Sequence, residues 1–117
     1  MTKDSLVFIE HMLESIKLIQ AFSRHLTKEK LAKNELRQSA ILRELEVIGE
    51  AVKNLPEEFI NKYPNMEWKK IAGLRDKLIH HYFGIDFDII WEVIEEDLPP
   101  LKKNLEDILN KEKQINS

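Results

Sequence analysis

Apolar residues recur every three or four positions along most of this 117-residue chain, and this spacing constrains the fold more than any other feature. Such a narrow seam is typical of a helix that packs against near-parallel neighbours. No run alternates at period two for long enough to predict a strand, so the sequence predicts an all-α fold. The clearest seam lies in the stretch ILRELEVIGEAVKNLP and consists of Ile41, Leu45, Ile48, Val52 and Leu55.

Breaks in this periodicity predict a bundle of four main helices plus one short helix, in which short connectors favour antiparallel neighbours. The short helix, PEEFINKY, opens at Pro56 and closes before Pro64, because a residue that precedes proline avoids the helical region. A polar connector is expected over residues 26–35. The first main helix is expected from an N-cap at Asp4 or Ser5 to about His25, and the second contains the seam that ends at Leu55. The third is expected from about Glu67 to Tyr82, with Gly84 as terminator. The last begins after an N-cap at Asp86 or Asp88.

The last helix carries a proline pair inside its apolar seam. Proline removes a backbone hydrogen bond, so a kink or a restart is predicted at Pro99 and Pro100. The tail over 111–117 is expected to fray, and a chain of this length is expected to form one domain over 1–117. The seam crosses the prolines through Ile90, Ile94, Leu98, Leu101, Leu105 and Ile108.

The composition excludes several classes of protein. Without cysteine there are no disulfides and no thiolate metal sites, which fits a reducing compartment. The first apolar run is interrupted by acidic residues and a histidine, so neither a signal peptide nor a membrane span is predicted, and we expect a cytoplasmic protein. A formal net charge of -3 argues against a protein that coats nucleic acid through bulk charge.

The charge distribution is more informative than the net charge. Residues 69–81 contain four basic side chains and one acid, whereas Asp86 to Asp97 contains six acids and no base. Two solvent-exposed helix faces of opposite charge would explain this change in charge as well as a functional site would. The basic side chains are Lys69, Lys70, Arg75 and Lys77.

The stretch GLRDKLIHHYFGID gathers the residues best suited to chemistry: Arg75, Asp76, His80 and Tyr82. On an ideal helix Arg75 and Tyr82 lie within roughly 20° of each other, but His80 lies about 140° round from Arg75. Either the helix ends before His80 and the chain turns back, or a site combines residues from two chains. A purely structural interpretation also stands, with His80 at a helix end and Arg75 paired to a surface acid.

Other catalytic signatures are missing from the sequence. There is no glycine-rich phosphate loop and no spaced set of metal ligands, since the adjacent His80 and His81 would diverge by about 100° on a helix. We therefore expect neither a metal nor a cofactor.

The segment RDKLIHHYFGID matches Arg-x4-His-x-Tyr, a signature of the HEPN superfamily. Together with ILRELEVIGEAVKNLP, WKKIAGLRDKLIHHYFGID and DIIWEVIEEDLPPLKKNLE, it makes nearly the whole chain resemble the HepT toxins, which pair with MntA-type minimal nucleotidyltransferase antitoxins. This resemblance implies a HEPN-like helical domain that acts as a metal-independent endoribonuclease. It also implies a homodimer in which the two motifs face each other across the interface.

The resemblance also implies roles for individual residues. Arg75 and His80 correspond to the catalytic pair, and Tyr82 to the tyrosine that receives AMP from the partner nucleotidyltransferase and so silences the toxin. Asp76 occupies a supporting position that is often asparagine in the family. Here a carboxylate would repel phosphate where an amide could donate a hydrogen bond.

These residue types suit the cleavage of RNA, which carries its own nucleophile in the 2′-hydroxyl. His80 can accept or donate a proton near neutral pH, and Arg75 can stabilise charge on the phosphate. The neighbouring lysines, Lys69, Lys70 and Lys77, could hold flanking phosphates. The alternatives are a non-catalytic dimeric module that binds a nucleotide or a partner nucleotidyltransferase, and a structural bundle without a ligand.

Overall fold

The computed structural model describes residues 2–80 and 84–115, with side chains over 5–79 and 84–115. The predicted all-α class is confirmed. Long helices alternate with short helical segments, and two strands of two residues each make one small reversal. The elements are α1 Thr2–Ser23, α2 Lys28–Ala32, α3 Glu35–Lys53, α4 Glu57–Lys62, α5 Trp68–Ala72, η1 Asp76–Leu78, β1 Ile79–His80, β2 Gly84–Ile85, α6 Phe87–Glu92, η2 Val93–Asp97 and α7 Leu98–Ile115.

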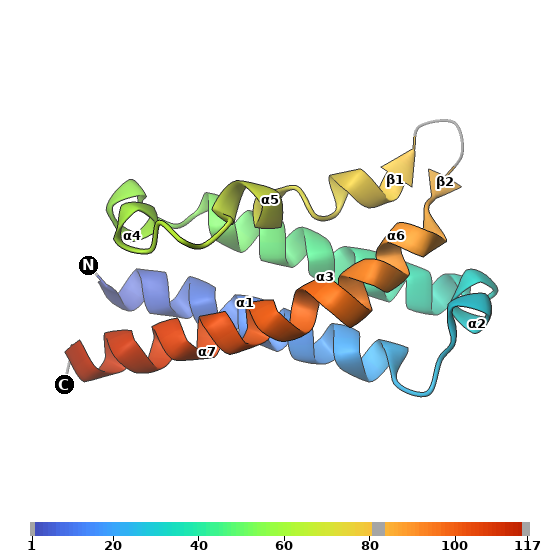
Figure 1. The fold of residues 1–117 in the computed structure, drawn as a ribbon, viewed down its shortest axis with the longest axis horizontal. Coiled ribbons are helices and arrows are strands. Elements are labelled where there is room, and N and C mark those ends of the chain that lie inside the picture. The colour runs from blue at the N-terminus through green and yellow to red at the C-terminus, as the bar shows by residue number, and fades with distance from the viewer. Residues whose placement is uncertain (1, 81–83, 116–117) are drawn as a thin grey trace.

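Three long helical runs form the body of the molecule. α1 packs against α3 and α7, and both of these run antiparallel to α1, so that the two chain termini lie at the same end (Figure 1). The segment from α4 to β1 returns along α3 toward the opposite end, where β1, β2 and α2 are found (Figure 1). The chain thus fills an elongated body of 47 × 29 × 20 Å.

The predicted apolar seams form the core. Every position of the seam in α3 and of the seam that runs from α6 to α7 is buried, and both meet the buried face of α1. Burying one such Leu or Ile side chain stabilises a fold by about 1.5–3 kcal/mol. On α1 this face consists of Ile9, Met12, Leu13, Ile16 and Ile19.

The N-terminal third differs from the prediction in two places. Ser5 lies inside α1 and is fully buried, so the N-cap expected at Asp4 or Ser5 is wrong. The polar connector over 26–35 contains the short helix α2, capped by Thr27, whose side chain accepts a hydrogen bond from the Lys30 backbone at 3.2 Å. Its large apolar side chain, Leu31, is fully buried, which explains why a mostly polar sequence folds here.

The prediction of a helix from Glu67 to Tyr82 is wrong beyond α5. The helix ends at Ala72, where Gly73 forms its C-cap, and a tight turn follows at η1. Ile79 then pairs with Ile85 and His80 with Gly84, while the Asp86 backbone N–H donates to the Leu78 carbonyl at 2.8 Å. The chain therefore reverses, and Gly84, with φ of 76°, belongs to this reversal rather than ending a helix.

The predictions for the short helix and the kinked last helix are confirmed. α4 begins after Pro56, and Asp86 caps α6 by accepting a hydrogen bond from the Ile89 backbone at 3.1 Å. The irregularity at the proline pair takes the form of a π-helical turn, η2, which ends two residues before Pro99. In this turn the Leu98 backbone N–H donates to the carbonyl of Val93, five residues earlier. The helix then continues through Pro99 and Pro100, which have no N–H to donate.

The C-terminal segment is more ordered than the expected frayed tail. α7 continues through 111–115, and Glu112 is fully buried there. Its carboxylate pairs with the Lys62 Nζ at 2.8 Å and accepts a hydrogen bond from the Tyr63 hydroxyl. These contacts tie the end of α7 to α4, which gives the last helical turns a tertiary partner.

Candidate functional site

The candidate site begins with an unusually close contact between α3 and α5. Gly49 of α3 lies directly against the carbonyl group of Ala72, the last residue of α5. A Cβ atom added at Gly49 would be 2.8 Å from that carbonyl oxygen, closer than real side chains approach. Only glycine therefore lets the end of α5 lie this near to α3. The sequence signal, an isolated glycine within a helical pattern, was available, but we did not interpret it.

This contact brings Arg75 over the surface of α3. Arg75 follows the end of α5 by three residues and precedes η1. Its Nε lies 3.3 Å from Oε2 of Glu46, and the two side chains are 41% and 43% exposed. The other oxygen of Glu46 accepts a hydrogen bond from Arg43 at 3.2 Å. The Glu46 carboxylate thus lies between two guanidinium groups, a feature that the sequence analysis missed.

Arg75 also lines a cleft of about 180 Å³ between α3 and the segment after α5. The lining includes Glu46, Gly49, Ala72 and Asp76. Asp76 is 83% exposed, and its Oδ1 lies 3.9 Å from Nη1 of Arg75, at the outer limit of an ion pair. An anion entering this cleft would meet a half-exposed guanidinium flanked by carboxylates.

The structure does not bring the predicted lysines together with Arg75. Lys77 pairs with Asp97 of η2 at 3.5 Å, and Lys70 lines a separate cleft between α5 and α7. Lys69 is exposed on α5. Arg75 faces α3, whereas Lys70 and Lys77 face the side of η2 and α7.

His80 and Tyr82 fall in or beside the chain reversal. The His80 backbone belongs to β1, but its side chain lies outside the described residues, as does Tyr82 altogether. From the sequence, two arrangements could bring Arg75 and His80 to one site. The end of the helix before His80 agrees with the arrangement in which the chain turns back. Arg75 and His80 therefore do not share one helix.

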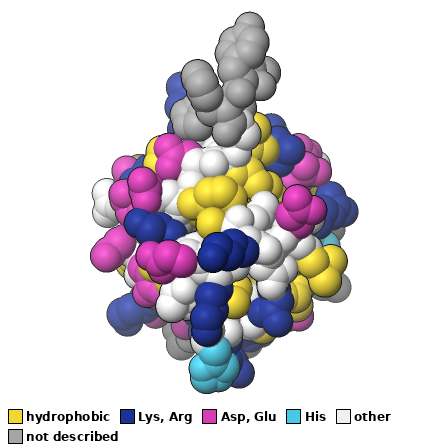
Figure 2. Space-filling model, turned by 90° about the vertical axis from the view of Figure 1, so that its right-hand side faces the viewer, with side chains coloured by type: hydrophobic (Ala, Val, Ile, Leu, Met, Phe, Trp, Pro, Cys, Tyr) yellow, Lys and Arg dark blue, Asp and Glu magenta, His cyan; other side chains and the backbone are white. Residues whose placement is uncertain are grey.

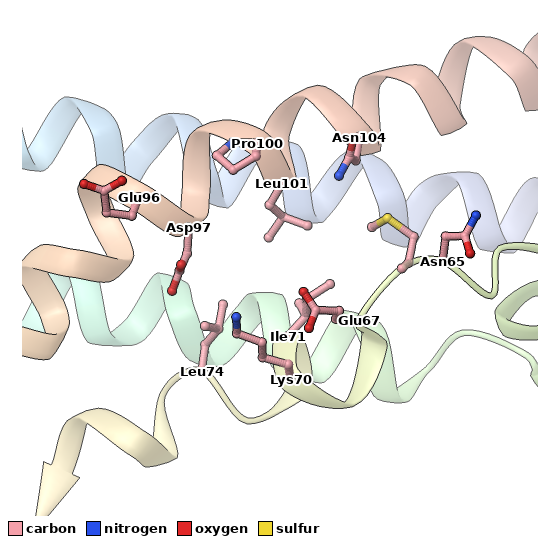
Figure 3. A pocket seen from close by; sticks show the side chains of 11 residues that line it. Asn65, Glu67, Lys70, Ile71, Leu74, Glu96, Asp97, Pro100, Leu101 and Asn104 are labelled. Carbon is pink, nitrogen blue, oxygen red and sulfur yellow. The ribbon is translucent and has the colours of Figure 1, made fainter.

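The cleft between α5 and α7 is lined by both charged and apolar side chains. Figure 3 shows Asp97 and Leu101 projecting from the upper helix toward Lys70 and Ile71 of the lower segment. The cleft holds about 170 Å³.

The surface charge is mixed at the end of the molecule where α2, β1 and β2 lie. Figure 2 shows basic and acidic side chains interspersed around a small apolar patch, with no continuous basic field on that face. Over the part of the chain that the structure describes, no group of three or more His, Asp or Glu side chains is placed to hold a metal ion. Within the same residues, no helix has the length and apolarity that crossing a bilayer requires.

Fold and site together define an all-α protein in which an arginine, held by a carboxylate, lies at the edge of a cleft just before a chain reversal. A family model described as "Ribonuclease HepT-like" matches residues 12–108. The chain belongs to this ribonuclease HepT-like family, which confirms the resemblance inferred from RDKLIHHYFGID and its flanking stretches.

Relatives from three organisms extend this similarity over almost the full chain. A protein of Methanocaldococcus jannaschii, whose name gives RNase as a provisional activity, is 50% identical over 92% of this chain and 88% of its own length. A protein of Caldanaerobacter subterraneus with the same provisional activity is 45% identical over 91% and 95%. A "Probable ribonuclease HepT" of Thermococcus cleftensis is 41% identical over 85% and 90%. No solved structure matched the chain.

Proposed function

We propose that this protein is an endoribonuclease toxin that cleaves RNA without a metal ion, with Arg75 and His80 as its catalytic pair. The main support is the Arg75 guanidinium, which is half-exposed at a cleft five residues before His80, in a family of ribonucleases. A buried arginine with all its donors occupied would not be available to a phosphate. Arg75 makes its close contact through Nε alone, so its terminal nitrogens remain available to a ligand.

The proposed reaction uses the substrate's own nucleophile. The RNA 2′-oxygen attacks the adjacent phosphorus, and His80 takes up the 2′-hydroxyl proton or delivers a proton to the departing 5′-oxygen. The bond from phosphorus to the 5′-oxygen breaks, which leaves a 2′,3′-cyclic phosphate on one fragment and a 5′-hydroxyl on the other. Arg75 stabilises the negative charge that develops on the non-bridging oxygens.

The decisive experiment incubates purified wild-type protein and a His80→Ala variant with total RNA in excess EDTA. We expect cleavage by the wild type alone, with cyclic-phosphate ends. Cleavage by His80→Ala would contradict the catalytic role of His80. RNA binding without strand scission by an AMP-free wild type would favour the non-catalytic binding module instead.

We also propose that each site forms across the interface of two copies of the chain, with Arg75 from one copy and His80 from the other. In that arrangement an Arg75→Ala chain and a His80→Ala chain complement each other, because one of the two sites in a mixed dimer is intact. Random mixing should then restore about a quarter of wild-type activity, since half the dimers are mixed and each has one working site. Mixtures with no restored activity would show that each site lies within one chain.

Tyr82 is proposed as the AMP acceptor through which a partner nucleotidyltransferase silences the toxin. A phosphodiester on this tyrosine adds volume and negative charge beside the place where a substrate phosphate binds. Co-expression with that partner should add the mass of AMP to the wild type and abolish cleavage. A Tyr82→Phe variant should stay unmodified and active, and an equally silenced Tyr82→Phe would exclude Tyr82 as the acceptor.

Asp76 is the position where this chain departs from the usual family motif. Its exposed carboxylate lies at the edge of the Arg75 cleft, where it would repel an incoming phosphate. We expect Asp76→Asn to bind RNA more tightly than the wild type, measured on a 2′-O-methyl oligonucleotide that cannot be cleaved. Weaker binding by Asp76→Asn would instead indicate that the carboxylate helps to orient Arg75.

A further inference from the structure

We infer that Glu46 is a positioning residue for the reaction, which holds the Arg75 guanidinium in the orientation that a phosphate requires. The inference rests on the proposed function of Arg75. The two residues come from different elements, α3 and the segment after α5, and meet at 3.3 Å. No motif in the sequence connects them.

The geometry of the contact favours a positioning role. Oε2 of Glu46 meets Nε, the nitrogen at the base of the guanidinium fork. Among the described residues, the terminal nitrogens have one distant ion-pair partner, Asp76 at 3.9 Å from Nη1, which a bidentate phosphate can displace. A carboxylate bound to the terminal nitrogens would compete with the substrate. A carboxylate bound at Nε restricts rotation of the guanidinium and leaves the edge with the terminal nitrogens open to a phosphate.

Glu46 is itself held on two sides. Its second oxygen accepts a hydrogen bond from Arg43, one turn earlier on α3, so the carboxylate cannot rotate without losing a partner. Gly49, nearly one turn later, allows the α5 backbone to approach and so brings Arg75 within reach. The helix that carries Glu46 is anchored by its opposite face, which is buried in the core.

Exposure separates this role from a structural one. Ion pairs that are accessible to water contribute little to folding, and both side chains here are more than two-fifths exposed. Removing the charge of Glu46 should therefore leave the melting temperature almost unchanged. A large loss of activity in a protein of normal stability would point to the orientation of Arg75.

The matched control is Asp107 on α7, which is not among the residues that line the Arg75 cleft. It is also exposed and also pairs with a cation, Lys103, at 3.9 Å. Glu46→Gln and Asp107→Asn thus each remove one carboxylate charge from an exposed ion pair. We expect kcat to fall by about 10- to 100-fold in Glu46→Gln with KM changed less than about threefold, because small misplacements of a positioned group cost that much. Asp107→Asn should stay within about threefold of wild type in both constants.

Two further measurements make the inference specific. In ¹⁵N-labelled protein the Arg75 Nε–H signal, identified by its loss in Arg75→Lys, should move in Glu46→Gln but not in Asp107→Asn. In the Arg75→Lys background, Glu46→Gln should cause no further loss of cleavage, because its effect passes through the missing guanidinium.

The outcomes separate this inference from the proposed function. An active wild type with a Glu46→Gln variant as active as Asp107→Asn would overturn the role of Glu46 and leave the ribonuclease intact. Additive losses in the double variant would also overturn it. A wild type that leaves RNA uncut, with Tyr82 confirmed as unmodified, would overturn the proposed function and the role of Glu46 in it.

Discussion

Two carboxylates hold basic side chains at helix junctions in this protein, and they do so in opposite surroundings. Glu112 is fully buried where α7 meets α4, and it pairs with Lys62 and accepts a hydrogen bond from Tyr63. Glu46 is 43% exposed where α3 meets the segment after α5, and it pairs with Arg75. The first arrangement removes its charge from water and ties two helices together. The second keeps a cation oriented and accessible.

The difference shows how burial decides what a charge pair does. A buried carboxylate that loses a partner destabilises the fold, because no water replaces the lost contact. A pair in water loses little stability but can still orient a group that binds a ligand. The α4–α7 junction should therefore respond to mutation in stability, and the α3–α5 junction in activity.

The largest expected effect is on catalysis at the exposed junction. Arg75→Lys keeps the charge but loses the planar fork, so we expect kcat/KM for RNA cleavage to fall by about 10²- to 10³-fold. The melting temperature should change by less than about 2 °C, since the lost ion pair is half-exposed. Cleavage assays and thermal melting of the same preparation test this. A Lys variant with wild-type activity would show that charge alone suffices.

At the buried junction, Glu112→Gln should lower the free energy of unfolding by about 1–3 kcal/mol. The amide loses the negative charge that pairs with Lys62, and its NH2 group takes the place of a buried oxygen, Oε1, that has no hydrogen-bond partner among the described residues. Urea unfolding measures the change, and the cleavage rate per folded molecule should stay at the wild-type level. Asp107→Asn, which breaks an exposed pair with Lys103, is the control and should cost less than about 0.5 kcal/mol. Equal losses in the two variants would contradict the comparison.

A smaller effect is expected at the contact that joins the two elements of the site. Gly49→Ala places a Cβ 2.8 Å from the Ala72 carbonyl oxygen, so α5 must move away from α3. We expect a net destabilisation of about 1 kcal/mol, because the greater helix propensity of alanine offsets part of the clash. Activity should fall further than stability does, since Arg75 moves with α5.

Gly73→Ala provides the matched control for that substitution. Its Cβ would meet the nearest atom, the Lys69 carbonyl oxygen, at an ordinary 3.6 Å. Both stability and cleavage should therefore stay near wild type. If the two alanine variants behave alike, the close approach of α5 to α3 does not position Arg75.

The smallest effect is on the pH dependence of stability. Burial raises the pKa of Glu112, but the hydrogen bonds from Lys62 and Tyr63 and the nearby positive charges outweigh burial and leave the pKa below its ordinary value of 4.5. A carboxylate with a lowered pKa stabilises the fold above pH 4.5, and that contribution is lost as the pH falls through the folded-state pKa. Unfolding curves from pH 6 to 3 should therefore converge for wild type and Glu112→Gln. A constant gap would exclude the ionised carboxylate as the cause.

The Tyr63 hydroxyl gives the same junction a dependence at high pH. Burial, together with the hydrogen bond to Glu112 and its negative charge, raises the Tyr63 pKa well above its ordinary value of 10. The neutral hydroxyl is therefore favoured in the folded protein. This contribution to stability is complete below pH 10 and is lost as the pH rises through the folded-state pKa.

Much of the fold was predictable because helix formation is recorded in local spacing. The seams of α3 and of the run from α6 to α7 are buried as their intervals predicted, and caps such as Asp86 act on residues three positions away. The family was also predictable, since its motif and flanking stretches occur in one continuous order.

Residues 67–86 were not predictable in the same way. Their periodicity continues through Leu74 and Leu78, and both side chains are buried, yet the helix stops at Ala72. Burial of these two leucines by a tight turn satisfies the same apolar pattern that a helix would. The pairing of Ile79 with Ile85 adds a contact that helix periodicity does not report.

By itself, the sequence determined the helical class, the apolar faces, the Asp86 cap and the membership of a ribonuclease HepT-like family, because each depends on residues close together in the chain. Only the tertiary structure decided which side chains meet across elements. Gly49 meets Ala72, Glu46 meets Arg75 and Glu112 meets Lys62 because packed helices place them together. The free energy of such contacts depends on distance and burial, and neither quantity is recorded in the spacing of residues along the chain.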